Sequence, residues 1–142
     1  AEQLEAASVA AMGEPLPRGH GERVLLVEDE VAILQMGQRM LQALGYRVLC
    51  AATPQQALIL VEGLAPPLDL LVTDVVMPGM NGQELAQRLK ARYPRLNVLY
   101  VSGYTPEVFQ QQGISLDTER LLPKPFTLSA LGEAMLEALA ED

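Results

Sequence analysis

The chain is poor in cysteine and aromatic residues, and each shortage excludes a class of protein. Its 142 residues contain a single cysteine, Cys50, so no internal disulfide can form and a disulfide-stabilised scaffold is excluded. Tryptophan is absent, and aromatic residues make up 4% of the chain against 49% for hydrophobic residues, which predicts an aliphatic core and argues against disorder. We interpret Cys50 as a small apolar residue of that core, with a redox sensor or nucleophile as the alternative.

Positive charge is also scarce, and the formal net charge is −8. A surface of this sign opposes binding to nucleic acid and direct contact with an anionic membrane, because both need a basic footprint. The sequence has no apolar run long enough to cross a bilayer, and its N-terminus lacks the pattern of a secretory signal. We therefore expect a cytoplasmic domain, with a monomer favoured, or a cytoplasmic part of a longer protein.

Composition divides the chain into two regions. Residues 1–22 begin with an Ala- and Glu-rich stretch that suits a short helix over residues 1–12, and continue with GEPLPRGHGE, which is typical of a linker. An ordinary frayed tail is the alternative. The one histidine, His20, stands between two glycines here and is interpreted as incidental. Residues 23–142 are predicted to form one folded domain around one core.

Short apolar runs alternate with helical periodicity from residue 23 onward. The apolar runs predict five strands, and the first is continuous, as in a strand buried on both faces: residues 24–27, 46–51, 68–73, 98–101 and 121–122. Helical spacing predicts five helices, the last with Thr127 as its N-cap: residues 33–44, 54–64, 83–93, 105–112 and 128–139. Strands alternating with helices indicate an α/β fold in which helices cover both faces of a parallel sheet.

Polar residues stand where the predicted strands end. Glu28 and Asp29 follow the first strand, Asp74 the third, Ser102 the fourth and Lys124 the fifth. Right-handed crossovers place all loops that follow parallel strands on one edge of the sheet, where ligands bind. The sequence therefore predicts that these five residues meet at one place.

Taken singly, these residues have structural interpretations. Asp29 is typical of a helix N-cap, Ser102 of a turn and Lys124 of a solvated surface cation. Their joint placement favours function, because three crowded carboxylates repel one another unless a hard cation or an ammonium group compensates them. Carboxylates combined with one lysine and one hydroxyl suit phosphoryl transfer, in which a carboxylate can be the nucleophile.

A role follows for each of these residues. Asp74, alone at the end of the central strand, is the predicted phosphoacceptor. Ser102 is expected to donate a hydrogen bond to one phosphoryl oxygen, and Lys124 to pair with another. The expected ligands of a Mg²⁺ ion are oxygens, completed by water: Glu28, Asp29, Asp74 and the backbone carbonyl of Val76.

The same residues lie in four segments, VLLVEDE, LLVTDVVMPGMNG, YVSGYT and LLPKPF. Together they resemble the signature segments of the receiver domain of two-component response regulators, from about Arg23 to the C-terminus. The resemblance implies a flavodoxin-like (βα)5 fold, a doubly wound parallel sheet of strand order 2-1-3-4-5, and a cis Lys124–Pro125 peptide. It also implies phosphoryl transfer to Asp74 from a phosphohistidine on a sensor histidine kinase or a histidine phosphotransfer protein. Such a domain is not an enzyme beyond self-phosphorylation and autophosphatase activity.

The chain departs from this family at two places. Receivers usually carry Phe or Tyr three residues before the lysine, where this chain has Leu121, and the nearest aromatic candidate is Tyr104. The aromatic switch is therefore predicted to be absent or re-routed, with motion concentrated in residues 104–120. Val76 and Tyr104 stand at positions that influence water access in the family, and neither is suited to orient an attacking water. We expect a long-lived aspartyl phosphate.

Several alternatives stay open. YVSGYT and KPFT resemble receivers at the C-termini of hybrid sensor histidine kinases, and a flexible leader suits a tethered receiver. A freestanding single-domain regulator is the alternative, and Leu121 leaves room for a degenerate receiver that serves only as a docking module. A haloacid-dehalogenase-type phosphohydrolase is disfavoured, because the triplet after the third strand, DVV, lacks the second Asp. A nucleotide-binding enzyme is disfavoured because acidic residues 28–30 stand where a Gly-rich turn is needed.

Overall fold

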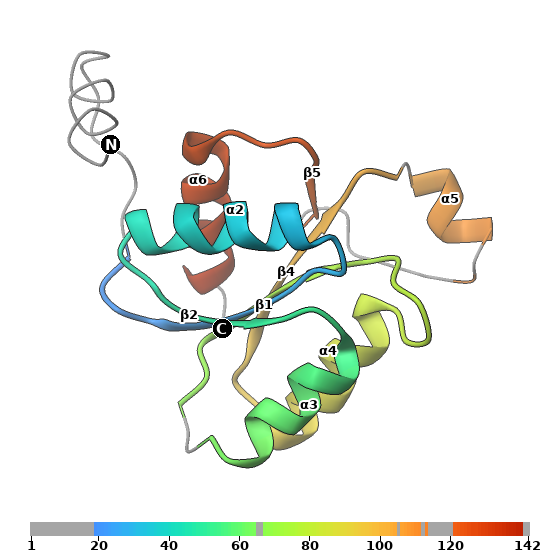
Figure 1. Ribbon diagram of the computed structural model, residues 1–142, viewed down its shortest axis with the longest axis horizontal. Coiled ribbons are helices and arrows are strands. Elements are labelled where there is room, and N and C mark those ends of the chain that lie inside the picture. Colours follow the sequence, from blue (N-terminus) through green and yellow to red (C-terminus); the bar gives the residue numbers. More distant parts are fainter. Residues whose placement is uncertain (1–18, 65–66, 105, 112, 114–120, 141–142) are drawn as a thin grey trace.

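The structure is a computed structural model that describes residues 19–64, 67–104, 106–111, 113 and 121–140 (Figure 1). Strands and helices alternate along these ranges, and the bounds lie within two residues of those predicted: β1 Arg23–Val27, α2 Val31–Ala43, β2 Arg47–Ala51, α3 Pro54–Glu62, β3 Leu70–Asp74, α4 Gly82–Arg92, β4 Asn97–Ser102, α5 Pro106–Gln111, β5 Leu121–Pro123 and α6 Leu128–Ala140. The helix predicted over residues 1–12 lies outside the described residues. Among the described helices, none has the length and apolar character needed to cross a membrane.

The five strands form one sheet in the order β2-β1-β3-β4-β5. Every neighbouring pair is parallel, so the predicted flavodoxin-like topology is confirmed. Val27 lies opposite Thr73, Asp74 opposite Val101, and Ser102 opposite Pro123. This register brings the carboxyl ends of β1, β3, β4 and β5 to the same edge, which we call the carboxyl end of the sheet.

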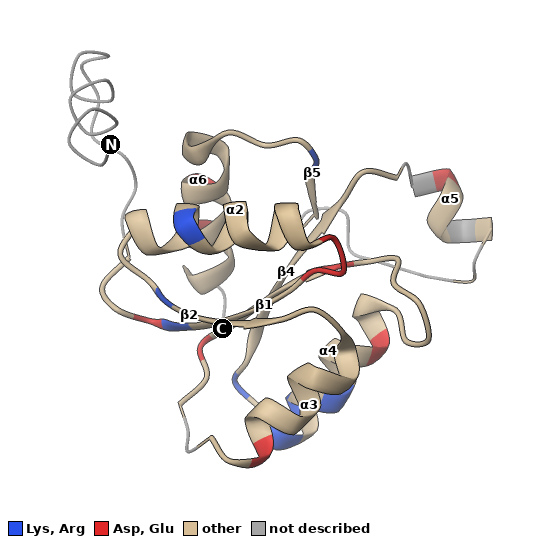
Figure 2. Ribbon diagram, viewed as in Figure 1, with Lys and Arg blue, Asp and Glu red and all other residues tan. Residues whose placement is uncertain are grey.

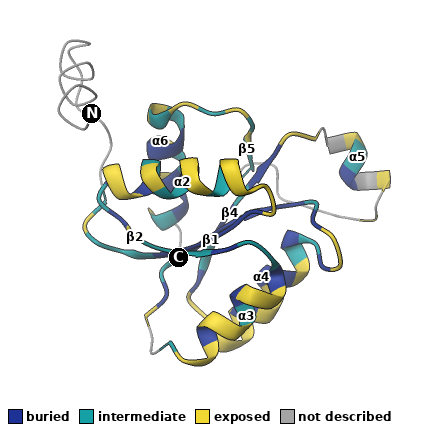
Figure 3. Ribbon diagram, viewed as in Figure 1, coloured by how far each residue is buried: buried dark blue, intermediate teal, exposed yellow. Residues whose placement is uncertain are grey.

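Helices cover both faces of the sheet, with α2 and α6 on one side and α3 and α4 on the other (Figure 1). The side chains between α2, α6 and the sheet form one apolar core, which includes Leu41, Leu131 and Met135. The core under α3 and α4 includes Leu85 and Leu89. Because β1 and β3 face a core on each side, almost all of their residues are buried (Figure 3), which explains their continuous apolar runs.

Helix starts show which polar residues the fold uses for itself. Asn81 and Glu84 form a capping box at the start of α4. Thr127 caps α6, as predicted, by accepting a 3.0 Å hydrogen bond from a backbone N–H in the first turn. At α2 the N-cap is Glu30, and no side chain makes a cap hydrogen bond. The alternative role of Asp29 as the N-cap is therefore wrong, and its carboxylate is left at the carboxyl end of the sheet.

The last residues of the predicted leader, residues 19–22, run beside the start of β2, and we call them the strap. Gly19 and Gly21 donate backbone hydrogen bonds of 2.7 and 2.8 Å to the turn before β2, and Arg47 donates one of 2.9 Å to the carbonyl of Glu22. A Cβ on Gly19 would lie 2.2 Å from the ring of Tyr46, so only glycine allows this close approach. The strap lies at the amino end of the sheet, opposite the predicted site.

Cys50 lies in β2, half-buried and packed against the core under α2 and α6. Burial raises the pKa of its thiol. A raised pKa lowers the fraction of reactive thiolate. The position therefore supports the interpretation of Cys50 as a small apolar residue.

Candidate phosphoacceptor and metal site

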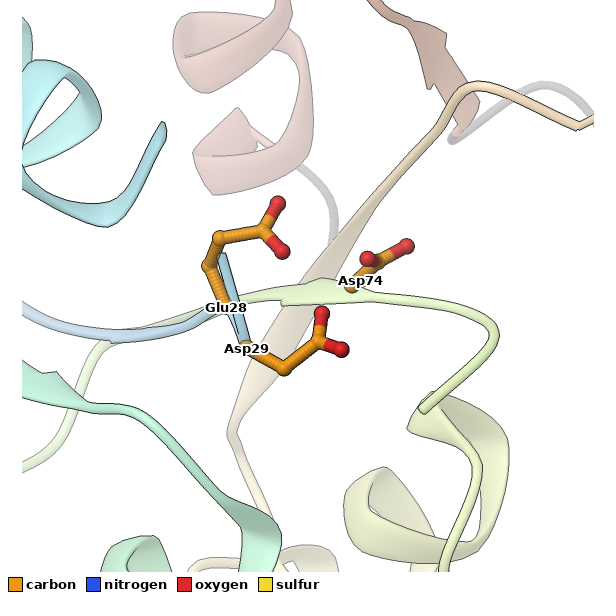
Figure 4. Close-up of side chains that lie close together, drawn as sticks. All are labelled: Glu28, Asp29 and Asp74. Carbon is orange, nitrogen blue, oxygen red and sulfur yellow. The ribbon is translucent and has the colours of Figure 1, made fainter. Parts of the chain in front are cut away.

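Three carboxylates meet at the carboxyl end of the sheet. Glu28 and Asp29 follow β1 directly, and Asp74 is the last residue of the neighbouring β3. Each offers one oxygen, and these oxygens all lie within 4.8 Å of one another. Figure 4 shows Glu28 and Asp29 projecting to opposite sides of the chain and the Asp74 carboxylate lying beside them. In Figure 2 the acidic loop after β1 stands out at this edge.

Burial makes this arrangement costly. Glu28 is 1% exposed and Asp74 5% exposed, whereas Asp29 is exposed to solvent. Removing carboxylates from water without compensating partners costs several kcal/mol per ion. The two buried carboxylates must therefore be compensated within the site.

Lys124 supplies that compensation from the position directly after β5, an edge strand of the sheet. Its ammonium forms ion pairs with Glu28 and, at 3.1 Å between Nζ and Oδ2, with Asp74. Burial acts to lower the pKa of Lys124, but the hydrogen bond to Glu28 and the charges of Asp74 and Glu28 outweigh it, so the pKa is raised. Lys124 therefore stays cationic between the two acids. The Lys124–Pro125 peptide that follows is cis, as the resemblance implies.

The pKa of Asp29 is raised by burial and by its place beside Glu28. Burial is the largest cause, and the hydrogen bond and negative charge of Glu28 raise the pKa further. The backbone hydrogen bond of Asp29 and the charge of Lys124 oppose this shift without reversing it. A cation placed between Asp29 and its neighbours would therefore favour the ionised form of Asp29.

The backbone around Asp74 is held in place by short contacts. The Val75 N–H donates a 2.9 Å hydrogen bond to Asp74 Oδ1, and the Thr73 hydroxyl donates one of 2.9 Å to the Asp74 carbonyl. Gly82, the first residue of α4, passes so close that a Cβ there would lie 2.2 Å from the same carbonyl oxygen. The loop after β3 therefore depends on a glycine to present the Asp74 carboxylate.

Ser102 has the hydrogen-bonding capacity expected of it. The residue is 1% exposed, and its Oγ accepts a 3.0 Å hydrogen bond from the Tyr104 N–H. A hydroxyl has one proton to donate and two lone pairs, so this bond leaves the proton for an acceptor at the site. The Ser102 carbonyl accepts a 2.8 Å hydrogen bond from the Lys124 N–H, which fixes the two residues side by side.

Three other predicted residues lie around this centre. Val76 follows Asp74 by two residues and is half-buried, and its carbonyl as a metal ligand stays a prediction. Tyr104 is 53% exposed and reaches the site through its backbone N–H, while Leu121 is half-buried in β5. Part of the segment predicted to move, residues 104–120, lies outside the described residues.

The sequence analysis missed Phe109. This residue of α5 is 3% exposed and packs against Val75, the residue after the predicted phosphoacceptor. Val76, Tyr100 and Leu121 complete this group, which we call the Phe109 cluster. The signal available was weak: an apolar Val-Phe pair within a six-residue helix, too short for a periodic pattern.

The donor set fits a hard divalent cation. Carboxylate oxygens are the ligands that Mg²⁺ prefers, usually one or two of them with several waters retained. Exposed Asp29 beside buried Asp74 leaves room for such waters, and the set contains neither the thiolate nor the imidazole typical of zinc. Glu28, Asp29 and Asp74 are the residues that would hold the ion.

Comparison with known proteins agrees with this geometry. Residues 24–136 match the response regulator receiver domain family. The sensor kinase CckA of Brucella abortus is 40% identical over 116 residues, which is 82% of this chain and 12% of that protein. The putative two-component response regulator ARR21 of Arabidopsis thaliana is 33% identical over 72% of this chain and 16% of that protein. The chain thus spans a small fraction of both relatives.

Solved structures give the same answer. A crystal structure of the receiver domain from the hybrid histidine kinase CckA is 37% identical, with a TM-score of 0.67, and the match covers 82% of this chain and 98% of that one. The chemotaxis protein CheY4 of Vibrio cholerae is 30% identical with a TM-score of 0.68, over 84% and 99% of the two chains. Receivers of two-component systems interact with histidine kinases or phosphotransfer proteins and are generally Mg²⁺-dependent. The chain belongs to the response regulator receiver domain family.

Proposed function

We propose that this chain accepts a phosphoryl group on Asp74 from a phosphohistidine, with Mg²⁺ as cofactor, and that the modification changes its conformation. One observation carries the proposal. The Asp74 carboxylate is 5% exposed, is held by the Val75 N–H and by Lys124, and has a ligating oxygen within 4.8 Å of those of two further carboxylates. A nucleophilic carboxylate among charge-neutralising groups is what phosphoryl transfer needs.

Phosphoryl transfer to Asp74 is a single displacement at phosphorus. An Asp74 carboxylate oxygen forms a bond to phosphorus while the phosphorus–nitrogen bond to the histidine breaks. The electron pair of that bond stays on the ring nitrogen, which takes up a proton from solvent. Mg²⁺, when bound, supplies positive charge against the phosphoryl oxygens. Lys124 pairs with one phosphoryl oxygen, and the Ser102 hydroxyl donates its proton in a hydrogen bond to another.

The proposed context is the C-terminal receiver of a hybrid sensor histidine kinase in the cytoplasm, and similarity to CckA supports it. In this context the chain acts as a phosphoacceptor, and its only catalysis is self-phosphorylation and autophosphatase activity. A freestanding regulator is the second candidate. An antibody against this domain separates the two on a denaturing gel of the native cells. A band at the size of a receiver domain alone, rather than at that of a multidomain kinase, would contradict the hybrid-kinase context.

The test of phosphorylation uses intact mass spectrometry. Purified chain is incubated with Mg²⁺ and acetyl phosphate, and in parallel with phosphoramidate, whose phosphorus–nitrogen bond resembles that of phosphohistidine. We expect a single phosphoryl mass shift in the wild type, and none in Asp74→Asn or in EDTA. Asp69→Asn is the matched control. Asp69 lies just before the same strand and accepts a 2.8 Å hydrogen bond from the Arg23 N–H, so its variant should be phosphorylated normally.

Two results would contradict the proposal. A mass shift that survives Asp74→Asn would mean that another residue is the acceptor. No shift of the folded wild type with either donor would favour a degenerate receiver that serves as a docking module. Circular dichroism of each variant separates loss of the acceptor from loss of the fold.

A further inference from the structure

We propose that Phe109 relays the phosphorylation state of Asp74 to α5, through the backbone and side chain of Val75. This inference rests on the proposed function, because it assumes that Asp74 is phosphorylated. It assigns the coupling to an aromatic residue of the helix after β4, rather than to β5, where the chain has Leu121.

The first link joins Asp74 to Val75. The Val75 N–H donates a 2.9 Å hydrogen bond to Asp74 Oδ1 and lies 3.3 Å from the carbonyl of Val101 on β4. A carboxylate oxygen carries more negative charge than the carbonyl oxygen of an acyl phosphate, so phosphorylation weakens this hydrogen bond. The position of Val75 therefore responds directly to the chemical state of its neighbour.

The second link joins Val75 to α5. The Val75 side chain is fully buried, and it packs with Phe109 at the centre of the Phe109 cluster. Close-packed side chains transmit a displacement, because their atoms cannot overlap and there is little empty space between them. A shift of Val75 must therefore be taken up by Phe109 or by the half-buried Val76 and Leu121 around it.

Phe109 is the buried residue of α5 among those whose burial the structure describes. Four residues of this helix have a described burial: Glu107 and Gln111 are exposed, Val108 is half-buried, and Phe109 is buried. In Figure 1 the helix stands beyond the carboxyl end of the sheet, apart from the two layers that cover the faces. Because Phe109 is packed inside the Phe109 cluster, a displacement of its side chain is passed to the helix backbone that carries it.

The start of α5 is tied to the same site by a second contact. The Tyr104 N–H, two residues before the helix, donates a 3.0 Å hydrogen bond to Ser102 Oγ. Turning the Ser102 hydroxyl toward a phosphoryl oxygen changes the geometry of this bond. Phosphorylation thus acts on α5 at both its beginning and its middle, and the differential contacts needed for a conformational switch are present.

The experiment measures amide hydrogen exchange in peptides covering α5, before and after phosphorylation with Mg²⁺ and acetyl phosphate or phosphoramidate, whichever donor labels the chain. Intact mass gives the phosphorylated fraction of each sample. In the wild type we expect α5 exchange to change by about tenfold, within the range of ordinary allosteric coupling. In Phe109→Ala we expect the phosphoryl mass shift to remain and the change in α5 exchange to disappear. Val108→Ala, the next residue on the same helix, should behave as the wild type.

Three outcomes would overturn the relay. The first is a wild-type response of α5 in Phe109→Ala, and the second is unchanged α5 exchange in the phosphorylated wild type. The third is the absence of a mass shift in the wild type, which refutes the proposed function and the relay together. If Phe109→Ala fails to fold, Phe109→Leu replaces it, because leucine keeps the site apolar without filling it. That variant should show a reduced response, and a full response would overturn the relay equally.

Discussion

The two ends of the β-sheet use the same residue types for different purposes. Asp69 precedes β3 and Asp74 ends it. At the amino end, Asp69 accepts a 2.8 Å hydrogen bond from the Arg23 N–H and donates one of 3.0 Å back to the Arg23 carbonyl. At the carboxyl end, Asp74 shares one lysine with Glu28 beside a third carboxylate. Asp69 therefore links β1 to β3 by hydrogen bonds, whereas the Asp74 carboxylate lies among charged groups that suit it to react.

The difference shows that polar groups at the amino end serve the fold alone, whereas those at the carboxyl end also serve the site. Apolar side chains of similar volume often replace a buried ion pair at no cost, so charges kept at the carboxyl end are poor evidence of stabilisation. The amino end is held by backbone hydrogen bonds of the strap and the turn before β2. We expect substitutions at the carboxyl end to change stability together with phosphorylation, and substitutions at the amino end to change stability alone.

The largest expected effect comes from Lys124→Met. This change leaves Glu28 and Asp74 buried without a cation, and removing one partner of a buried ion pair typically costs about 3–5 kcal/mol. Urea unfolding in EDTA should show this loss in the free energy of unfolding. Mg²⁺ should restore part of it, since the ion takes over the compensation of charge. An equal loss with and without Mg²⁺ would show that these carboxylates do not bind the ion in the variant.

Two glycine substitutions give a matched comparison of the two ends. In Gly82→Ala the new Cβ would lie 2.2 Å from the Asp74 carbonyl oxygen, and in Gly19→Ala it would lie 2.2 Å from the Tyr46 ring. Because a backbone atom cannot rotate away, we expect Gly82→Ala to cost about 3 kcal/mol and to slow phosphorylation. Gly19→Ala should cost about 1 kcal/mol by displacing the strap, with phosphorylation unchanged. Chemical denaturation and the intact-mass assay measure both effects, and slower phosphorylation in Gly19→Ala would contradict the separation of the two ends.

A smaller effect is expected on the lifetime of the aspartyl phosphate. Val76 offers no polar group to an attacking water, so the phosphorylated wild type should hydrolyse slowly. Val76→Asn or Tyr104→Glu should accelerate hydrolysis roughly tenfold, equivalent to about 1.4 kcal/mol of activation free energy. The decay of the phosphoryl mass after removal of the donor gives the rate. Ile59→Asn, at an exposed side chain of α3, is the control, and equal decay in all four proteins would refute the prediction.

The smallest effect is expected at the amino end, where Tyr46→Phe should stabilise the protein. The Tyr46 hydroxyl is buried without a hydrogen-bond partner among the described residues. Removing an unsatisfied buried hydroxyl should raise the free energy of unfolding by about 1 kcal/mol. Tyr93→Phe is the contrasting control, because the Tyr93 hydroxyl donates a 3.1 Å hydrogen bond to the Leu64 carbonyl and its loss should destabilise. Similar stability changes in both variants would show that the Tyr46 hydroxyl has a partner.

The same tyrosine gives the pH dependence. Burial, followed by the charge of Glu22, raises the pKa of Tyr46 from 10.0 to about 12. Above pH 10 the unfolded state releases a proton that the folded state still holds, so the free energy of unfolding is unaffected by this group below pH 10 and falls as pH rises through about 12. Urea unfolding across this range should show a steeper loss in the wild type than in Tyr46→Phe. Identical curves would contradict the shift.

Much of the fold and the site could be read from the sequence, because the signals were local. The continuous apolar run before Glu28 indicated a strand buried on both faces, and Thr127 indicated the start of the last helix. The alternative role of Asp29 as the N-cap of α2 was wrong. The N-cap is the next residue, Glu30, and no side chain makes a cap hydrogen bond. An N-cap is decided by the geometry of a single turn, and here that turn begins at Glu30, which lacks the short side chain that usually marks an N-cap.

The sequence by itself determined that polar groups gather at one edge, because the strands are parallel and their carboxyl ends must meet there. Only the tertiary structure decided how they pair. The ammonium of Lys124 reaches Glu28, 96 residues away, as well as Asp74. It also decided that Phe109 lies against Val75, since a six-residue helix has too few turns to reveal which face it buries. Periodicity records local geometry, whereas contacts between distant side chains depend on how the layers pack.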